Sequence, residues 1–161
     1  MVLAIIEGVV LSFVLLLVCV VNIRNGAVGG VHFYEQDVKD RVVKMGLITA
    51  GQIRRNKLLS FIPFAVALLI LAPLMAFCVN GAKTFLQGFA QLTAMYAVCG
   101  LFDRIFIDWY WVGCTKAWVI EGTEDLMPYI KPATWVKKIV LTILLYPLLA
   151  ALLSWVFMLF I

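Results

Sequence analysis

The chain has 161 residues, of which 65% are hydrophobic and only 14% are charged. A soluble globular domain is roughly half apolar and about a quarter charged, so this composition excludes a soluble-type enzyme and indicates a membrane protein. The net charge of +4 does not indicate nucleic-acid binding, because the Lys and Arg residues lie mostly beside apolar runs, where they set membrane topology.

Four apolar runs approach the roughly 20 residues that a helix needs to cross about 30 Å of hydrocarbon. They cover residues 2–23, 58–79, 85–102 and 139–161. We therefore predict an all-α, integral membrane four-helix bundle that forms one domain over residues 1–161. The first run is interpreted as an uncleaved helix rather than a signal peptide, because no basic residue precedes it and no good cleavage site follows it.

Basic residues are distributed unevenly between the connections. Residues 24–57 hold seven and residues 103–138 hold five, whereas the short turn after the second run holds only Lys83. The positive-inside rule then places both long connections in the cytoplasm and both termini outside. We expect a location in a bacterial plasma membrane, with membrane lipids and, in one interpretation, further copies of this chain as partners.

Glu7 is the only carboxylate in the first run. A charged group inside a membrane is costly and faces protein or water rather than lipid. It is therefore either part of a proton- or cation-linked site or a structural group that reaches the outer interface or bonds to a neighbouring helix.

The first long connection begins with a glycine-rich segment. Apolar residues then recur at helical spacing from Val31 to Leu47, which predicts an amphipathic helix against the cytoplasmic interface. Three acid–base pairs at i,i+4 support it, namely Glu35–Lys39, Asp37–Arg41 and Asp40–Lys44. His32 is the only histidine and lacks partners that would make it a metal ligand.

The second long helix is predicted to begin at Thr49, which forms a capping-box pattern with Gln52. Arg54, Arg55 and Lys57 follow before the apolar run. They either anchor the topology or bind headgroup phosphates or another anionic ligand. Prolines 63 and 73 predict kinks in this helix, since each removes a backbone donor.

The third helix is expected to extend beyond its apolar run, because no Gly or Pro interrupts residues 101–112. At about 100° for each of five residues, Asp103 and Asp108 would be separated by about 140° and would not share a face. An acid/base pair would therefore need a group from another element, and Glu35 is a candidate. Arg104 and Asp108 have the i,i+4 spacing of an ordinary ion pair.

Six Trp and Tyr residues fall between Trp109 and Trp135, and they either form an interfacial aromatic belt or line the mouth of a pocket. The acidic residues 121, 124 and 125 are interpreted as a solvated turn, and no metal site is predicted. The four cysteines show no CxxC spacing, so we expect no disulfide framework.

These features predict a small polytopic membrane protein with a pocket at the cytoplasmic interface that binds or modifies a lipid-like or amphipathic molecule. The candidate catalytic residues are Asp103, Asp108 and Glu35, and the candidate ligand-binding residues are Arg54, Arg55, Trp109, Trp111 and Trp118. No motif identifies a cofactor or decides whether the protein is an enzyme. One alternative is an oligomeric transporter or channel subunit with a polar path lined by Glu7, Gln87 and Gln91; another is a non-catalytic scaffold or partner subunit.

Overall fold

The computed structural model describes residues 1–160, and over that range the regular structure is entirely helical. The predicted all-α class is confirmed. Four helices are long and apolar enough to cross a membrane. They are α1 (Val2–Ile23), the continuous helix made of α3 (Ala50–Val66), η2 (Ala67–Leu71), α4 (Ala72–Leu74) and η3 (Met75–Val79), then α5 (Phe85–Phe102) with its extension η4 (Asp103–Val112), and α6 (Pro132–Phe157).

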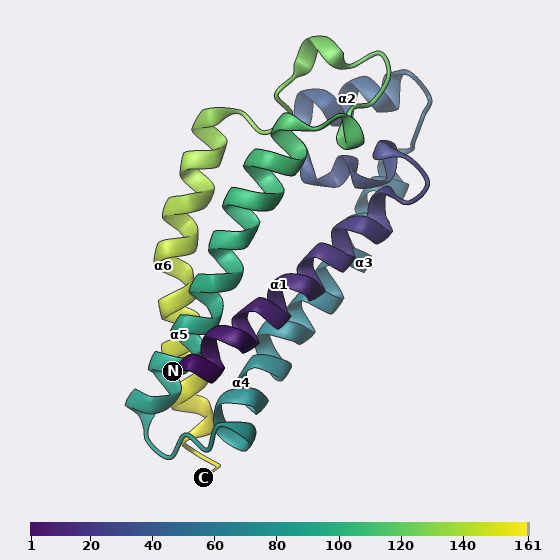
Figure 1. Ribbon diagram of the computed structural model, residues 1–161. Helices are drawn as coiled ribbons and strands as arrows, with labels where there is room; N and C mark the ends of the chain where they lie inside the picture. Colours follow the sequence, from purple (N-terminus) through teal and green to yellow (C-terminus); the bar gives the residue numbers. More distant parts are fainter. Residues whose placement is uncertain (161) are drawn as a thin grey trace.

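The long helices form two arms (Figure 1). One arm is α1 with the α3–η3 helix, and the other is α5 with α6. The arms meet at the end that carries both termini and diverge toward the other end. There they hold a structure that we call the polar cap, made of η1 (Ala27–Phe33), α2 (Gln36–Lys44), η5 (Lys116–Trp118), η6 (Glu124–Leu126) and their connections.

Glycines on α1 and α5 allow the helices to approach closely. A Cβ on Gly8 would lie 2.8 Å from the Cβ of Val98 and 2.9 Å from the carbonyl oxygen of Met95, where α1 meets α5. A Cβ on Gly100 would lie 2.7 Å from Thr142, where α5 meets α6. Such distances are too short for any larger residue, so these glycines determine how close the two contacts are.

The two prolines of the second long helix do not end it; instead, its turns widen to π-helix in η2 and η3. In η2 the N–H of Ala72 donates to the carbonyl of Ala67, five residues earlier. The next donor in this pattern would be Pro73, which has no N–H, so the carbonyl of Leu68 loses its backbone partner. The buried hydroxyl of Tyr96 donates to that carbonyl at 2.6 Å and thereby ties α5 to this helix.

The polar cap joins the two long connections. The Tyr34 hydroxyl donates to the carbonyl oxygen of Trp118 at 2.7 Å, and the rings of Tyr34 and Tyr129 lie 4.6 Å apart. The hydroxyl of Tyr129 in turn accepts from the backbone N–H of Ile120 at 3.0 Å. These buried contacts hold the cap together, and its buried side chains belong to the same hydrophobic core as those of the long helices.

The amphipathic helix predicted from Val31 to Leu47 is shorter in the structure, because extended backbone at Tyr34 and Glu35 separates η1 from α2. Its three local acid–base pairs are also wrong. Lys131 binds Glu35 and Asp37 at 3.4 and 2.7 Å, and Arg41 binds Asp125 at 3.2 Å. Glu35, Asp37 and Arg41 therefore hold the two connections together rather than supporting one helix.

The second helix begins at the expected cap, and the third helix has a cap of the same kind. Thr49 and Gln52 form both bonds of the capping box, and Thr84 accepts from the backbone N–H of Gln87. The fourth helix begins at Pro132, ahead of the apolar run at residues 139–161, since proline suits the first turn of a helix. The last predicted residue of this span, Ile161, lies outside the described residues.

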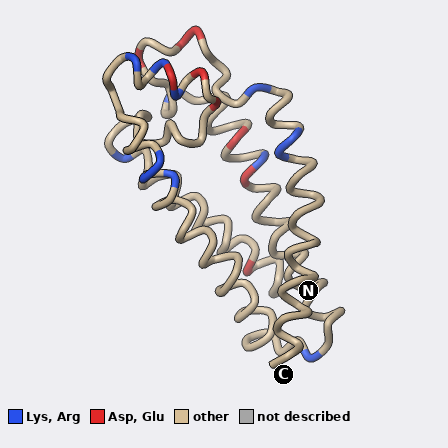
Figure 2. Tube along the Cα trace, turned by 180° about the vertical axis from the view of Figure 1, so that it is seen from behind, with Lys and Arg blue, Asp and Glu red and all other residues tan. Residues whose placement is uncertain are grey.

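Apolar side chains cover the outside of both arms. In the most apolar window of each long helix, only 11% to 39% of the residues are buried. Charged residues gather at the polar cap and the adjoining ends of the helices (Figure 2). A surface of this size and composition needs lipid or protein to cover it.

Candidate functional site

A cluster of charged side chains lies where the arms diverge below the polar cap. Arg104 forms ion pairs with both Asp103 and Asp108. Lys138 of α6 approaches the same Asp108 carboxylate at 3.2 Å. The Asp108 side chain is only 8% exposed, and those of Asp103 and Arg104 are 15% and 16% exposed. Two acids and two bases therefore share one poorly solvated site, with opposite charges in balance.

The two carboxylates come together because η4 is a π-helix. Its turns hold more residues than an α-helical turn, so five residues complete close to one full turn. The expectation that Asp103 and Asp108 lie on different faces is therefore wrong, since it assumed α-helical geometry throughout. The expected ion pair between Arg104 and Asp108 is confirmed. The indole N–H of Trp135 also donates to the carbonyl oxygen of Arg104 at 3.0 Å, which ties α6 to this segment.

The charged cluster lies on an otherwise apolar cavity of about 210 Å³ between the arms. The apolar walls come from both arms and the cap: Leu15 and Cys19 of α1, Phe33 of η1, Phe64 of α3, Ile107 and Val112 of η4, Trp118 of η5, and Ile130. Its volume is below the range of about 300–1,000 Å³ that is usual for pockets holding a drug-sized molecule. The cavity is therefore sized for one end of a larger molecule.

Two buried donors at this site have no hydrogen-bond partner among the described residues. They are the Nε of Arg104 and the indole Nε1 of Trp118, which both belong to residues lining the cavity. An unpaired buried donor costs about 1–3 kcal/mol. A carbonyl, carboxylate or phosphate oxygen brought against either donor by a small movement of the side chains would satisfy it, while an attached chain would contact the apolar walls.

A second hollow, of about 380 Å³, lies beside the cavity and shares Asp108 and Ile130 with it as lining residues. It is lined mainly by apolar groups, including Trp109 and Trp135, and Trp109 is 60% exposed. Trp111 packs edge-on against Trp118 with ring centroids 5.0 Å apart. Of the aromatic candidates, Trp109 thus lines the outer hollow, Trp118 lines the inner cavity, and Trp111 supports Trp118.

The remaining candidates lie elsewhere. Glu35 is on the polar cap and binds Lys131. Burial alone would raise the pKa of Glu35, but the hydrogen bond from the backbone N–H of Lys131 holds it below its ordinary value. Arg54 lines a separate basic pocket between the cap and the start of α3, and the neighbouring Arg55 is exposed and lines none of the hollows described here. The structure therefore brings Asp103 and Asp108 together without Glu35, Arg54 or Arg55.

The polar residues of the transporter alternative lie near the end of the molecule that carries the termini. Glu7 is buried and accepts a hydrogen bond from Asn80 at 2.7 Å. Gln87 accepts from the backbone N–H of Lys83 at 2.9 Å, and Gln91 shares a surface hollow with Gln87. None of these residues lines the cavity between the arms.

For two residues of the site, the sequence indicated only a structural role. Lys138 directly precedes the fourth apolar run, where a lysine typically anchors a helix at the lipid headgroups. It lies 30 residues from Asp108 in the sequence. Cys19 reads as an ordinary apolar residue of the first helix, yet it lines the cavity. No periodicity within one helix could have revealed either residue, since both reach the site through packing between helices.

Metal and disulfide chemistry are not indicated in the described part of the chain. All four cysteines are free. No group of three or more His, Cys, Asp or Glu side chains within residues 1–160 is placed to hold a metal ion. In the acidic turn, Thr123 lies immediately before η6 and Gly122 has a φ of +82°.

Comparison with known proteins adds no further assignment. No family model matches the chain, and neither a curated protein nor a solved structure matches it. The functional interpretation therefore rests on the geometry of the chain itself.

Proposed function

We propose that the chain is an integral membrane protein whose cavity between the arms binds the polar end of an amphipathic molecule. The observation that carries this proposal is the buried cluster of Asp103, Arg104, Asp108 and Lys138 on an otherwise apolar cavity. A ligand with an oxygen-bearing head would accept from the unpaired donors, and its chain would leave through the outer hollow beside Trp109.

In this proposal the four long helices form a membrane bundle with the polar cap in the cytoplasm and both termini outside. The charge distribution supports this orientation, since twelve of the thirteen basic residues lie in the two connections on the cap side or at the adjoining helix ends. The cavity then lies at the level where headgroups meet hydrocarbon, which is where an amphipathic ligand would approach from the bilayer.

Binding is better supported than acid/base catalysis. A general base needs a carboxylate that is free to accept a proton from its substrate. Asp103 is bound to Arg104, and Asp108 is bound to both Arg104 and Lys138. A reaction at this site would first require these ion pairs to open, whereas binding requires only the donors that are already unpaired.

Cavity-blocking variants test the proposal. Cys19→Phe would fill part of the cavity, whereas Cys78→Phe makes the same change at an exposed position. The protein would be equilibrated in mild detergent with phosphatidylglycerol, phosphatidylethanolamine and a long-chain fatty acid, and bound species would be counted by native mass spectrometry. We expect Cys19→Phe to weaken the tightest binding roughly tenfold, which corresponds to about 1.4 kcal/mol, and Cys78→Phe to leave it unchanged.

Equal binding by the wild type and by Cys19→Phe would contradict the proposal. Cys19→Leu adds less volume and tests the same direction should the phenylalanine prevent folding.

Topology has its own test. In a background with Cys78→Ser and Cys114→Ser, which removes the exposed thiols, Lys83→Cys should react with an impermeant maleimide in intact cells. Glu124→Cys on the polar cap should react only after the cells are permeabilised. The opposite pattern would reverse the proposed orientation.

A further inference from the structure

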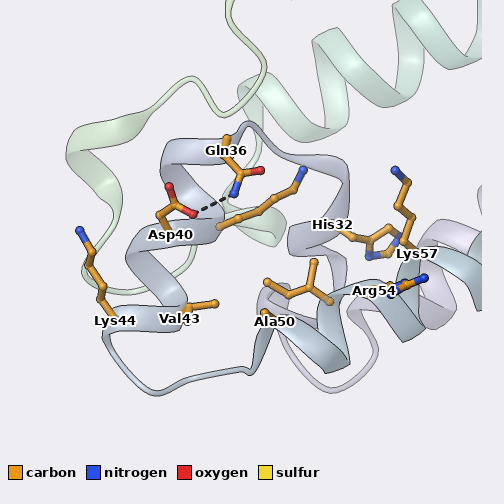
Figure 3. Close-up of a pocket in the computed structure, with 10 residues that line it drawn as sticks. His32, Gln36, Asp40, Val43, Lys44, Ala50, Arg54 and Lys57 are labelled. Atoms are coloured by element: carbon orange, nitrogen blue, oxygen red, sulfur yellow. Dashed lines mark hydrogen bonds between the residues drawn. The ribbon is translucent and has the colours of Figure 1, made fainter.

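A further pocket, between the polar cap and the start of α3, is not used by the proposed function. It has a volume of about 450 Å³ and lies between α2 and the start of α3, with His32 of η1 on one wall (Figure 3). Its charged lining comes from two helices: Lys39, Asp40 and Lys44 on α2, and Arg54 and Lys57 on α3.

The charge of this pocket is unbalanced. Four cations line it against one carboxylate. Within residues 1–160, the ion pairs involve Arg41, Arg104, Lys131 and Lys138, and none involves the four cations of this pocket. The single acid, Asp40, accepts from the amide of Gln36 at 2.8 Å rather than pairing with Lys44. Cations kept together without counter-charges repel one another, and an anion bound between them would remove that repulsion.

His32 supplies an independent indication of a ligand. The residue is only 7% exposed, it lines the pocket, and the backbone of Gly29 lies near its ring without completing a hydrogen bond of good geometry to either ring nitrogen. Burial lowers the pKa of His32 to about 4; the backbone of Gly29 opposes this shift, and the nearby charges of Lys39 and Lys57 add to it. The ring is therefore neutral at pH 7, with one donor and one acceptor nitrogen left unsatisfied.

We propose that this pocket binds a phosphate group, with Arg54, Lys57 and Lys39 around its oxygens and the N–H of His32 as a further donor. Cations that approach from two helices suit a group with several charged oxygens. The helix that carries Arg54 and Lys57 continues directly into the apolar segment beginning at Leu58. The phosphate of a lipid headgroup would lie at this level, and a soluble phosphate compound has the same chemistry.

The experiment compares the two sources of phosphate. The full-length protein is placed in nanodiscs of phosphatidylcholine alone and titrated with inorganic phosphate and with glycerol phosphate, using isothermal calorimetry. In a second arm, native mass spectrometry compares retention of phosphatidic acid and phosphatidylcholine by the protein in detergent. Saturable binding in the first arm would identify the ligand of the pocket as a soluble phosphate compound. Selective retention of phosphatidic acid in the second arm would identify it as a lipid headgroup.

Matched variants show whether binding occurs in this pocket. Arg54→Gln removes a cation that lines it, and Arg55→Gln removes the neighbouring exposed cation that does not. We expect Arg54→Gln to weaken phosphate binding about tenfold and Arg55→Gln to weaken it less than about twofold, because a charge-assisted hydrogen bond is lost only in the first. Equal effects of the two variants, or no phosphate binding in either arm, would overturn the proposal. Both positions are exposed, and unchanged melting temperatures would confirm that both variants fold.

Discussion

The charged cluster between the arms makes a specific prediction about paired substitutions. Asp108→Asn leaves Asp103 with two cations and a net positive charge, and Lys138→Met leaves Arg104 with two carboxylates and a net negative charge. The double variant retains Asp103 and Arg104 alone and is neutral. The two substitutions should therefore compensate for each other.

The magnitude follows from the geometry. At 3.2 Å and an effective dielectric constant of about 20, the attraction between Lys138 and Asp108 is about 5 kcal/mol, and desolvation offsets most of it. The Lys138 side chain is 30% exposed, so solvent screens it in part. We expect Asp108→Asn to lower the free energy of unfolding by about 3 kcal/mol and Lys138→Met by about 1–2 kcal/mol. In the double variant, the loss in free energy of unfolding should be smaller than the sum of the two single losses by at least about 1 kcal/mol.

The assay is unfolding in detergent micelles with increasing dodecyl sulfate, followed by circular dichroism. Lys137→Met provides a matched control, because Lys137 is the neighbouring lysine of α6, is exposed, and forms no ion pair within the described residues. Its effect should add to that of Asp108→Asn within roughly 0.5 kcal/mol. Additivity of Lys138→Met with Asp108→Asn to the same degree would refute the view that these charges act as one cluster.

Three further predictions concern the fold. Gly8→Ala should destabilise the protein by about 1–3 kcal/mol in thermal unfolding, since the added Cβ would overlap with α5. Gly51→Ala is the control: its Cβ would have no atom closer than 4.0 Å, so this variant should be neutral or stabilising in the same assay. Tyr96→Phe should cost about 1–3 kcal/mol in the same assay, because the carbonyl of Leu68 would be left unpaired, and an unchanged stability would contradict that role. Burial lowers the pKa of His32 to about 4, so as the pH falls below about 6.5 this histidine takes up a proton in the unfolded chain before it does so in the folded protein. The free energy of unfolding should therefore fall by about 2 kcal/mol between pH 7 and pH 5. His32→Phe should abolish this loss, and a loss that persists in the variant would exclude His32 as its source.

The long helices could be predicted from the sequence because their signals are local. Apolar runs near the length of a membrane span, a capping box at Thr49, and the absence of Gly or Pro between Leu101 and Val112 each depend on neighbouring residues. The extension of the third helix beyond its apolar run is accordingly confirmed. Local signals gave the helix but not its type, and the wider turns of η4 changed which residues share a face.

The site itself could be predicted only in part, because its contacts are between distant segments. Asp103 and Asp108 stand out as acids beside an apolar run, but Lys138 reaches them from another helix. The same limit explains the error on the polar cap. Glu35 has a base at i+4, as an isolated helix would favour, yet its actual partner is Lys131, 96 positions later. Spacing along one helix cannot decide between a local partner and a tertiary one.

Quenching of Trp118 fluorescence by a brominated fatty acid tests the central claim most directly. Trp118 is 1% exposed and lines the cavity, whereas Trp155 is 58% exposed on the outside of α6. Two proteins would be prepared, each keeping one of these tryptophans and carrying phenylalanine at the other Trp positions. A ligand that enters the cavity predicts saturable quenching of Trp118, lost in Cys19→Phe, and non-saturable quenching of Trp155 that Cys19→Phe does not change. Quenching of Trp118 that is absent, or that does not saturate, would contradict the account.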